Sequence, residues 1–425
     1  MPTIQVADKP TLDAVKVDTE NILKNMGSAG AVIYGVKISK SDSNPSTRVQ
    51  YTHNAVGMTP AHMNYDTGAF DYGDWEKVFF VEGNYPVMLN YDGTVAYKLN
   101  PNDYTLKADG TASDYNNASF AGNAMARIPL AYIAMYEDAN YEYLEVSDVK
   151  VNDNFQAIAH TKQDGTVVDE IFLAMFAGSL VDNKLRSIAG QVHVRNKTAA
   201  NEITYAKANN PSTRSDTNGW YTRTWGQRML INAFLILMGK STNTQLVFGN
   251  GDSSSYVDDA SQNYGMVTPG SVETMIKGGQ FWGSTDTKLQ HKVFHMEDWW
   301  GNQWERIAGL INDHGTYKVS FTGPYNTTGD GYANAGDTPS ANGYIKGNRC
   351  NKYGRLPTDT GGSSTTYDCD RIYDSGQQGD MTIAVMGGRN ELTESYIGAL
   401  CFNFLVSATH VSDFYKFGAC LSFID

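Results

Sequence analysis

One stretch of this sequence constrains the fold more than any other. Residues 224–238 read TWGQRMLINAFLILM, and apolar side chains occupy nearly every position around a helix built from them. Such a helix has no polar face to turn toward water, so the rest of the chain must enclose it. Gly239 follows where a C-terminal cap is expected. We therefore expect one long buried helix at about 224–238.

The chain around this helix has the pattern of short strands. From residue 31 to about 122, alternating runs such as AVIYGVKI and KVFFVEG are separated by DG and NP turns. The segment Tyr91-Asp92-Gly93-Thr94 is the clearest hairpin turn. Residues 140–195 continue with strand-like runs, and no internal repeat is visible. The predicted class is α+β, β-rich with the one long buried helix.

The N-terminus predicts a separate short helix at residues 8–26, which ends before Gly27. Its apolar positions at mostly helical spacing are Leu12, Val15, Ile22, Leu23 and Met26. A short amphipathic helix outside a core needs a partner to bury its apolar stripe. One interpretation is an attachment or oligomerisation element at residues 1–45, followed by one domain at 46–425. The other is a helix packed on its own domain.

Charge and composition exclude several classes of protein. The net charge of -13 disfavours nucleic-acid binding, because phosphate contacts need a basic surface. No apolar run approaches the roughly 20 residues of a membrane span, and MPTIQVADKP lacks the regions of a signal peptide. The 41 glycines and 26 tyrosines instead indicate a loop-rich scaffold with residue types that binding surfaces favour.

The cysteines and histidines do not indicate catalysis. The four cysteines, Cys350, Cys369, Cys401 and Cys420, are too few for a disulfide scaffold, and both reduced thiols and two local disulfides remain open. Cys401 and Cys420 lie in apolar stretches, where burial favours the inert thiol. His291 and His295 have i,i+4 spacing without an HExxH motif, which favours a structural role over zinc. We expect no enzyme activity, no metal and no cofactor.

Two loops carry oxygen ligands of the kind that bind calcium, Asn250-Gly251-Asp252 and residues 330–337. Asp and Asn are also ordinary turn residues, and solvated turns are the simpler interpretation. Residues 295–305, HMEDWWGNQWE, form what we call the tryptophan segment. Its tryptophans, Trp299, Trp300 and Trp304, are expected in the core because Trp buries so much area. Gly301 would allow close backbone approach and Asn302 would hold a turn.

The tryptophan segment resembles the WGNxWE segment shared by C-type-lectin-like proteins of the sulfatase-modifying type and by phage variable proteins served by diversity-generating retroelements. The resemblance extends over most of residues 50–425, through DGTVAYKLNPNDYTLKADGTASD, GNAMARIP, TWGQRMLINAFLILMGKSTNTQLVFGNG and GRLPTDTGGSSTTYDCD, which are similar to prophage proteins of gut bacteria. The end, with Gly387, Gly388 and Gly418 in GALCFNFLVSATHVSDFYKFGACLSF, resembles the GGS…GxxxxNLNNxxSNSNxxIGxRLSF ending of retroelement-diversified proteins.

The family pattern has asparagines where this chain has other residues between Phe404 and Lys416. In the family, error-prone copying of adenines diversifies those positions, so the chain is either a diversified copy or a drifted relative. Lys416, Glu391 and Glu394 cannot arise from an Asn codon by changes at adenines alone. The resemblance implies a C-type-lectin-like domain with a ligand-binding region at 386–425. Its expected ligand contacts are Arg389, Asn390, Leu392, Tyr396, Phe402, Phe404, Val406, His410, Asp413, Tyr415 and Lys416.

Exposed aromatic side chains among these residues would form an interaction patch, whereas alternating burial would make Phe402 or Phe404 strand core. The resemblance implies a phage receptor-binding or adhesion protein of the tail-fibre or tail-tip type, carried on the virion. It would bind a bacterial surface protein or glycan, contact other phage proteins through its N-terminus and form a homo-oligomer, such as a trimer. The alternative is a structural virion protein, a decoration or baseplate subunit that uses the fold only as a scaffold.

Overall fold

The computed structural model describes residues 30–214, 218–254, 261, 265–276, 278–374, 382–386, 397–411 and 417–425. Strands account for 37% of the chain and helices for 11%. The predicted α+β class, a C-type-lectin-like domain with one long buried helix, is therefore wrong: the protein is mostly β, with antiparallel sheets and short helices. The physical reason is that short alternating runs outnumber helical ones along the whole chain. The helix expected at residues 8–26 lies outside the described residues.

The first sheet has four strands in the order β2-β1-β10-β9, all antiparallel. Their bounds are Tyr34–Ser39 (β1), Val49–His53 (β2), Tyr132–Glu137 (β9) and Tyr141–Ser147 (β10). Val36 and Ile38 of β1 are fully buried in the main core. The boundary drawn at residue 45 therefore falls inside a hydrogen-bonded sheet, and the described part of 1–45 is integral to the core.

The second sheet has seven strands in the order β14-β26-β11-β8-β5-β6-β7. Their bounds are Tyr85–Asn90 (β5), Val95–Asn100 (β6), Asp103–Lys107 (β7), Gly122–Pro129 (β8), Glu170–Ala174 (β11), Gly219–Thr222 (β14) and Leu421–Ile424 (β26). The predicted turn joins β5 to β6: Gly93 has φ +90°, and the Thr94 N–H donates to Asp92 Oδ1 at 3.0 Å. The hairpin prediction is confirmed.

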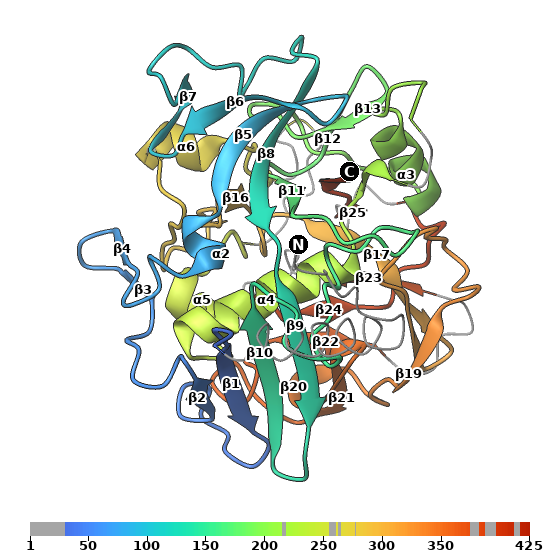
Figure 1. Ribbon diagram of the computed structural model, residues 1–425. Coiled ribbons are helices and arrows are strands. Elements are labelled where there is room, and N and C mark those ends of the chain that lie inside the picture. The colour runs from blue at the N-terminus through green and yellow to red at the C-terminus, as the bar shows by residue number, and fades with distance from the viewer. Residues whose placement is uncertain are drawn as a thin grey trace, which may run out of the picture.

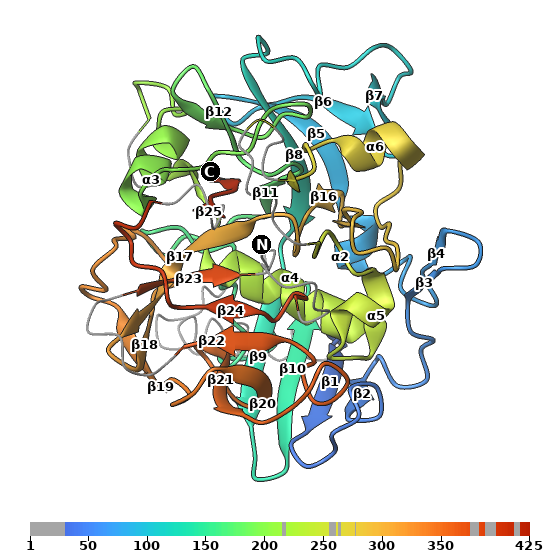
Figure 2. The same ribbon diagram turned by 180° about the vertical axis from the view of Figure 1, so that it is seen from behind.

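The third sheet has nine strands, in the order β19-β18-β17-β23-β24-β22-β20-β21, with β25 paired to β17. Their bounds are Trp304–Asp313 (β17), Thr316–Val319 (β18), Ala333–Asp337 (β19), Gly343–Asn351 (β20), Gly354–Thr360 (β21), Arg371–Tyr373 (β22), Thr382–Met386 (β23), Phe402–Asn403 (β24) and Phe417–Gly418 (β25). Figure 2 shows β17, β23, β24 and β22 side by side in orange to red.

Three two-stranded ribbons and the helices complete the described fold. The ribbons are His62–Asn64 (β3) with Ala69–Asp71 (β4), Ser179–Val181 (β12) with Lys184–Arg186 (β13), and Lys292–Val293 (β15) with Met296–Glu297 (β16). The helices are Phe79–Glu82 (α2), Ala199–Lys207 (α3), Trp225–Gly239 (α4), Thr244–Phe248 (α5) and Ser271–Ile276 (α6).

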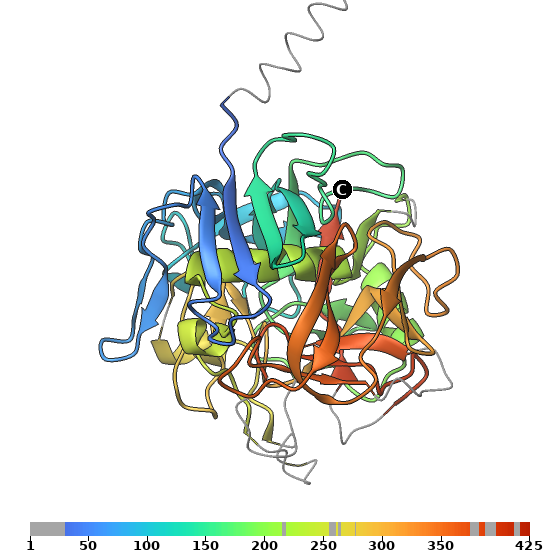
Figure 3. The same cartoon turned by 90° about the horizontal axis from the view of Figure 1, so that it is seen from below.

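Helix α4 lies at the centre of the molecule, between the sheets (Figures 1 and 3). At fifteen residues it is about four turns long and buried along nearly its whole length. Thr224 and Gln227 form a capping box, in which each side chain accepts the other's backbone N–H. The left-handed cap is Lys240 at φ +47°, one residue beyond the expected Gly239. Gly239 is the last helical residue, and a Cβ there would lie 2.8 Å from the Val247 side chain, which favours glycine at this position.

Candidate functional site

The tryptophan segment forms part of the core. Trp299, Trp300 and Trp304 are all buried, as the sequence predicts. The Trp299 indole N–H donates to Asn232 Oδ1 at 2.8 Å, which ties the segment to α4. The same Asn232 donates from Nδ2 to the Ala399 carbonyl at 2.9 Å. One amide therefore joins α4, the tryptophan segment and the chain leading into β24.

Gly301 and Asn302 shape the loop between β16 and β17. Gly301 has φ +78°, and a Cβ there would lie 2.8 Å from the backbone nitrogen of Asp252. The Asn302 side chain accepts the Val267 N–H at 2.9 Å and donates to the Val267 carbonyl and to Asp298 Oδ2, both at 2.8 Å. Asp252 is itself buried, and its carbonyl accepts the Asn302 N–H. The loop predicted as a solvated turn therefore packs beneath the tryptophan segment instead.

Glu305, at the start of β17, is the centre of a buried ion cluster. Its carboxylate lies 2.7 Å from Arg223 Nη1 and 3.2 Å from Arg228 Nη1. Both guanidinium groups lie over the Trp299 ring, at 4.5 and 4.2 Å from its centroid. Burial lowers the pKa of Arg228 to about 10, although Glu305 opposes the shift. Charge pairing and ring contacts together fix β17 against α4.

The C-terminal aromatic residues point into the protein. Phe402 and Phe404 are buried, and their rings stack with centroids 5.9 Å apart and planes inclined by 10°. Val406 is buried in a small separate cluster with Trp304 and Phe417. Of the two alternatives for Phe402 and Phe404, the structure therefore favours strand core. Phe402, Phe404 and Val406 cannot touch a ligand directly, which corrects their assignment as ligand contacts.

His410 lies at the rim of this cluster and is half-buried. Its ring lies 5.8 Å from that of Phe417, and its carbonyl accepts a hydrogen bond from Arg306 Nη2 at 2.7 Å. Burial and then the charge of Arg306 lower the pKa of the imidazole. Arg306 also pairs with Glu202 of α3 at 3.0 Å. The chain at His410 is therefore anchored to both β17 and α3.

Strand register brings two points of the predicted binding region, Met386 and Gly418, to the same residue of β17. Glu305 of β17 lies opposite Met386 of β23 on one side and opposite Gly418 of β25 on the other. Residues 387–396 start directly after Met386, and residues 412–416 end directly before β25. We call this part of the nine-stranded sheet, formed by Glu305, Met386 and Gly418, the display edge. Both segments of the predicted ligand-binding region are attached at it.

Most of the predicted contacts lie outside the described residues. These are Arg389, Asn390, Leu392, Tyr396, Asp413, Tyr415 and Lys416, together with the motif residues Gly387 and Gly388. Gly418 is described and buried, and its role is steric. A Cβ there would lie 2.7 Å from the Gln303 amide and from the Val194 carbonyl oxygen. Glycine at this position therefore lets β25 approach the tryptophan segment closely.

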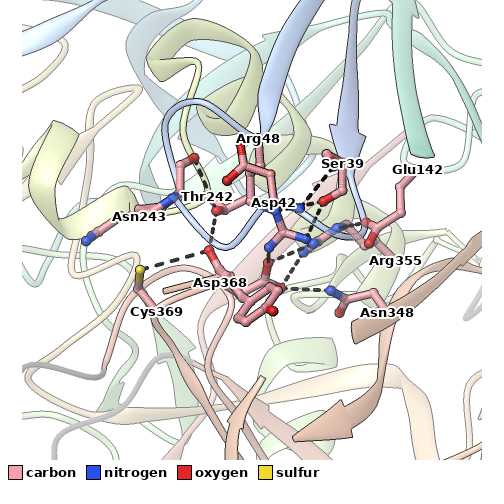
Figure 4. Close-up of polar contacts among 12 residues, drawn as sticks. Ser39, Asp42, Arg48, Glu142, Thr242, Asn243, Asn348, Arg355, Asp368 and Cys369 are labelled. Carbon is pink, nitrogen blue, oxygen red and sulfur yellow. Dashed lines mark hydrogen bonds and ion pairs between the residues drawn. The ribbon is translucent and has the colours of Figure 1, made fainter. Parts of the chain in front are cut away.

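The structure also contains a buried charge cluster that the sequence did not indicate, here called the guanidinium cluster (Figure 4). Its members are Arg48, Glu142, Arg355 and Asp368. Asp368 receives both terminal nitrogens of Arg355, at 2.6 and 2.8 Å, and Arg48 Nη1 at 3.2 Å. Arg355 Nε lies 2.5 Å from Glu142 Oε2. Since Arg48 and Asp368 are 320 residues apart, no sequence spacing could have signalled the pairing.

The titration of these two acids differs because their surroundings differ. Burial alone would raise the pKa of Asp368, but Arg355 and Arg48 outweigh it and hold that pKa below its ordinary value. Burial dominates at Glu142 and raises its pKa, although Arg355 opposes the shift. With two cations and two carboxyl groups, the cluster joins the turn before β2, strands β10 and β21, and the loop before β22. Its geometry is that of a structural tie, since every charged group is enclosed by protein.

Three of the four cysteines, together with His291 and His295, are buried, and Cys420 is half-buried. All four cysteines are free thiols, which decides between the two alternatives left open by the sequence. Burial raises the pKa of the Cys420 thiol to about 12 and that of Cys401 well above its ordinary value. His295 shares a 2.7 Å hydrogen bond with the Tyr104 hydroxyl, and His291 stacks on Trp300 at 3.8 Å. Within the described ranges, no three His, Cys, Asp or Glu side chains are grouped to hold a metal ion.

None of the helices in the described part of the chain is long and apolar enough to cross a membrane. Comparison with models of known protein families and with curated proteins finds no match to this chain. The resemblance to phage variable proteins therefore stays a prediction from the sequence.

Proposed function

We propose that this chain is a receptor-binding protein of a phage or prophage particle, which presents residues 387–396 and 412–416 to a molecule on the bacterial surface. The observation that carries the proposal is that described residues flanking both segments, Met386 and Phe417, pair with β17 where its side chains are buried and tied to the core. A binding surface of variable sequence needs such a base, because replacements within it must not unfold the protein.

The anchors at the segment ends support this division between base and surface. Asp370 accepts the backbone N–H groups of Gly398 and Leu400, at 2.6 and 2.8 Å, directly after residues 387–396. Trp304 pairs with Phe417 in parallel register directly after residues 412–416. The described residues directly after each segment are therefore anchored in a strand or a buried loop. A rigid base also reduces the conformational entropy lost on binding.

The sequence of the two segments fits recognition. They contain Arg389, Asn390, Tyr396, Tyr415 and Lys416, of which Tyr and Arg are enriched at interface hot spots. Of these residues, Tyr415 lies within the part of the family ending that the resemblance identifies as diversified. An oligomer held through the N-terminus, such as a trimer, would multiply weak contacts by raising the effective concentration of neighbouring sites.

The test is a triple variant, Asp413→Ala with Tyr415→Ala and Lys416→Ala, in the full chain. The matched control replaces three exposed residues elsewhere, Asp164, Val56 and Lys77, which are an acid, an apolar residue and a base. Binding of each labelled protein to a panel of whole bacteria is measured by flow cytometry, and folding by thermal melting.

We expect cell binding to fall at least about ten-fold in the triple variant, the loss of one to two hot-spot contacts, while its melting temperature and that of the control stay unchanged. Full binding by the triple variant would refute the assignment of the surface. A variant that melts early and fails to assemble into particles would favour the structural virion subunit instead.

A further inference from the structure

A groove on another part of the protein has the features of a second binding site. It consists of two adjoining hollows of about 250 and 530 Å³, which share Thr161 and Phe321 as part of their walls. Residues 153–163, strand β14, the first turn of α4 and the loop before Pro324 enclose it. We call it the aromatic groove. Its described lining does not include the display edge.

Aromatic side chains form much of the groove surface. Trp220, Tyr221 and Tyr325 line the smaller hollow, while Tyr136 and Tyr353 line the larger one. Tyr221, Tyr325 and Tyr353 are half-buried, so part of each ring is accessible. The centroids of the Tyr221 and Tyr325 rings are 5.4 Å apart. Flat rings spaced along an open groove suit the apolar faces of ring-shaped or chain-like ligands.

Two buried acceptors in the smaller hollow have no partner. Gln163 Oε1 and Asn218 Oδ1 are both inaccessible to solvent, and neither receives a hydrogen bond from any described residue. Buried carbonyl oxygens without donors are uncommon, because each loses its hydration without compensation. Both residues line the hollow and are half-buried as a whole, so rotation of either amide would present its oxygen to a ligand hydroxyl. The groove therefore suits a ligand rich in hydroxyl groups.

The groove is lined by basic residues, although the chain as a whole is acidic. Lys162, Lys207 and Lys352 line it, and none of the three forms an ion pair with a carboxylate of the described residues. Among the described lining residues the one acid is Asp153, and its carboxylate already pairs with Lys150 at 3.2 Å. Lys207 lies over the Tyr221 ring at 5.5 Å and Lys352 over the Tyr353 ring at 5.1 Å. In a chain of net charge -13, three lysines without a carboxylate partner among the described residues favour an anionic ligand.

We propose that the aromatic groove binds an anionic glycan or polyol chain, whose hydroxyl groups meet Gln163 and Asn218 and whose carboxylate or phosphate groups meet the lysines. Three lysines in an acidic protein are too few for nucleic acid, whose affinity rests on many phosphate contacts. The groove would act independently of the display edge, because its residues come from other elements.

The test is a titration of the full chain with three probes by isothermal calorimetry. The probes are a hyaluronan octasaccharide, a glycerol-phosphate oligomer and a neutral cello-oligosaccharide. We expect one anionic probe to bind at least about ten-fold more tightly than the neutral one, and the two anionic probes to distinguish carboxylate from phosphate recognition. Equal binding of all three, or none at millimolar concentration, would overturn the proposal. Tighter binding of poly-glutamate than of either anionic probe would also overturn it, since a polypeptide would then be the ligand.

Variants locate the site. The double variant Lys207→Gln with Lys352→Gln should weaken the anionic probe about ten-fold or more, as for the loss of charge-assisted hydrogen bonds. Lys77→Gln with Lys346→Gln, two exposed lysines outside the groove, should leave binding unchanged. Equal effects of the two double variants would overturn the assignment. The Asp413/Tyr415/Lys416 variant should retain glycan binding, so failure here and failure of the receptor-binding proposal are distinguishable.

Discussion

The substitution Asp368→Asn tests whether the guanidinium cluster holds the fold together. Asp368 accepts three guanidinium hydrogen bonds, two from Arg355 and one from Arg48, and a fourth bond from Asn348 Nδ2 at 2.9 Å. The charged side chains are at most 2% exposed. Asn keeps the shape but removes the charge and turns one oxygen into a donor. Two buried cations would then share the single carboxyl group of Glu142.

The expected loss is about 3–5 kcal/mol, the typical effect of removing one partner from a buried ion pair. Unfolding entropy is about 2.1 cal/mol/K per residue. For 425 residues that is about 0.9 kcal/mol/K, if the chain unfolds as one unit. A loss of about 4 kcal/mol therefore lowers the melting temperature by about 4–5 °C.

Differential scanning calorimetry at neutral pH measures this change directly. The matched control is Asp66→Asn, the same substitution at an exposed turn position whose side chain forms no hydrogen bond or ion pair with another described residue, and it should melt with the unmodified protein. Because the pKa of Asp368 is lowered in the fold, its stabilisation is present above the unfolded pKa and is lost as pH falls through the folded one. The gap between variant and wild type should shrink in acid. A variant that melts within about 1 °C of wild type at pH 7 contradicts the reasoning.

Three further predictions concern single positions. Gly301→Ala should destabilise the protein more than Gly331→Ala in urea melts. The two glycines have nearly the same backbone angle, φ +78° and +77°, but of these two positions only Gly331 has open space for a Cβ. Equal losses of about 1 kcal/mol, the cost of the backbone angle alone, would mean that Asp252 moves away freely. Burial raises the pKa of Glu202 to about 7, although Arg306 opposes it, so its contribution to stability is present below the unfolded pKa and is lost as pH rises to about 7. The unfolding free energy of the unmodified protein should therefore fall between pH 4 and 8, and in Glu202→Gln this fall should be smaller by about 3 kcal/mol. A fall of the same size in both proteins contradicts a raised pKa of Glu202. Ellman's reagent at pH 8, in the absence of reductant, should label the four thiols only after the protein is denatured. If the denatured protein does not react, the cysteines form disulfides instead.

Local patterns were enough to predict several elements. A DG pair between strands acts on its immediate neighbours, so the turn at Gly93 follows from adjacent residues. The tryptophans of the tryptophan segment were also predictable as core, because their area alone favours burial. The fold class was not predictable, because one apolar helix does not indicate how many short strands surround it.

Much of the candidate site could not be predicted from local sequence patterns. Alternation near Phe402 left two alternatives, and only the packing of Phe402 on Trp225, with ring centroids 5.9 Å apart, favours the core. Sequence placed the ends of the binding region by motif, yet their meeting at the display edge depends on the pairing of β17 with two strands from later in the chain. Register between distant strands is set by tertiary contacts, which no local pattern carries.

The sequence by itself determined the burial of Trp299, Trp300 and Trp304 and the turn between β5 and β6, because those depend on side-chain area and on immediate neighbours. Only the tertiary structure decided the rest. The guanidinium cluster joins residues up to 320 positions apart, and the aromatic groove is assembled from seven separate parts of the chain. Charges and hydrogen-bond acceptors interact strongly only when folding places them side by side and removes the water between them.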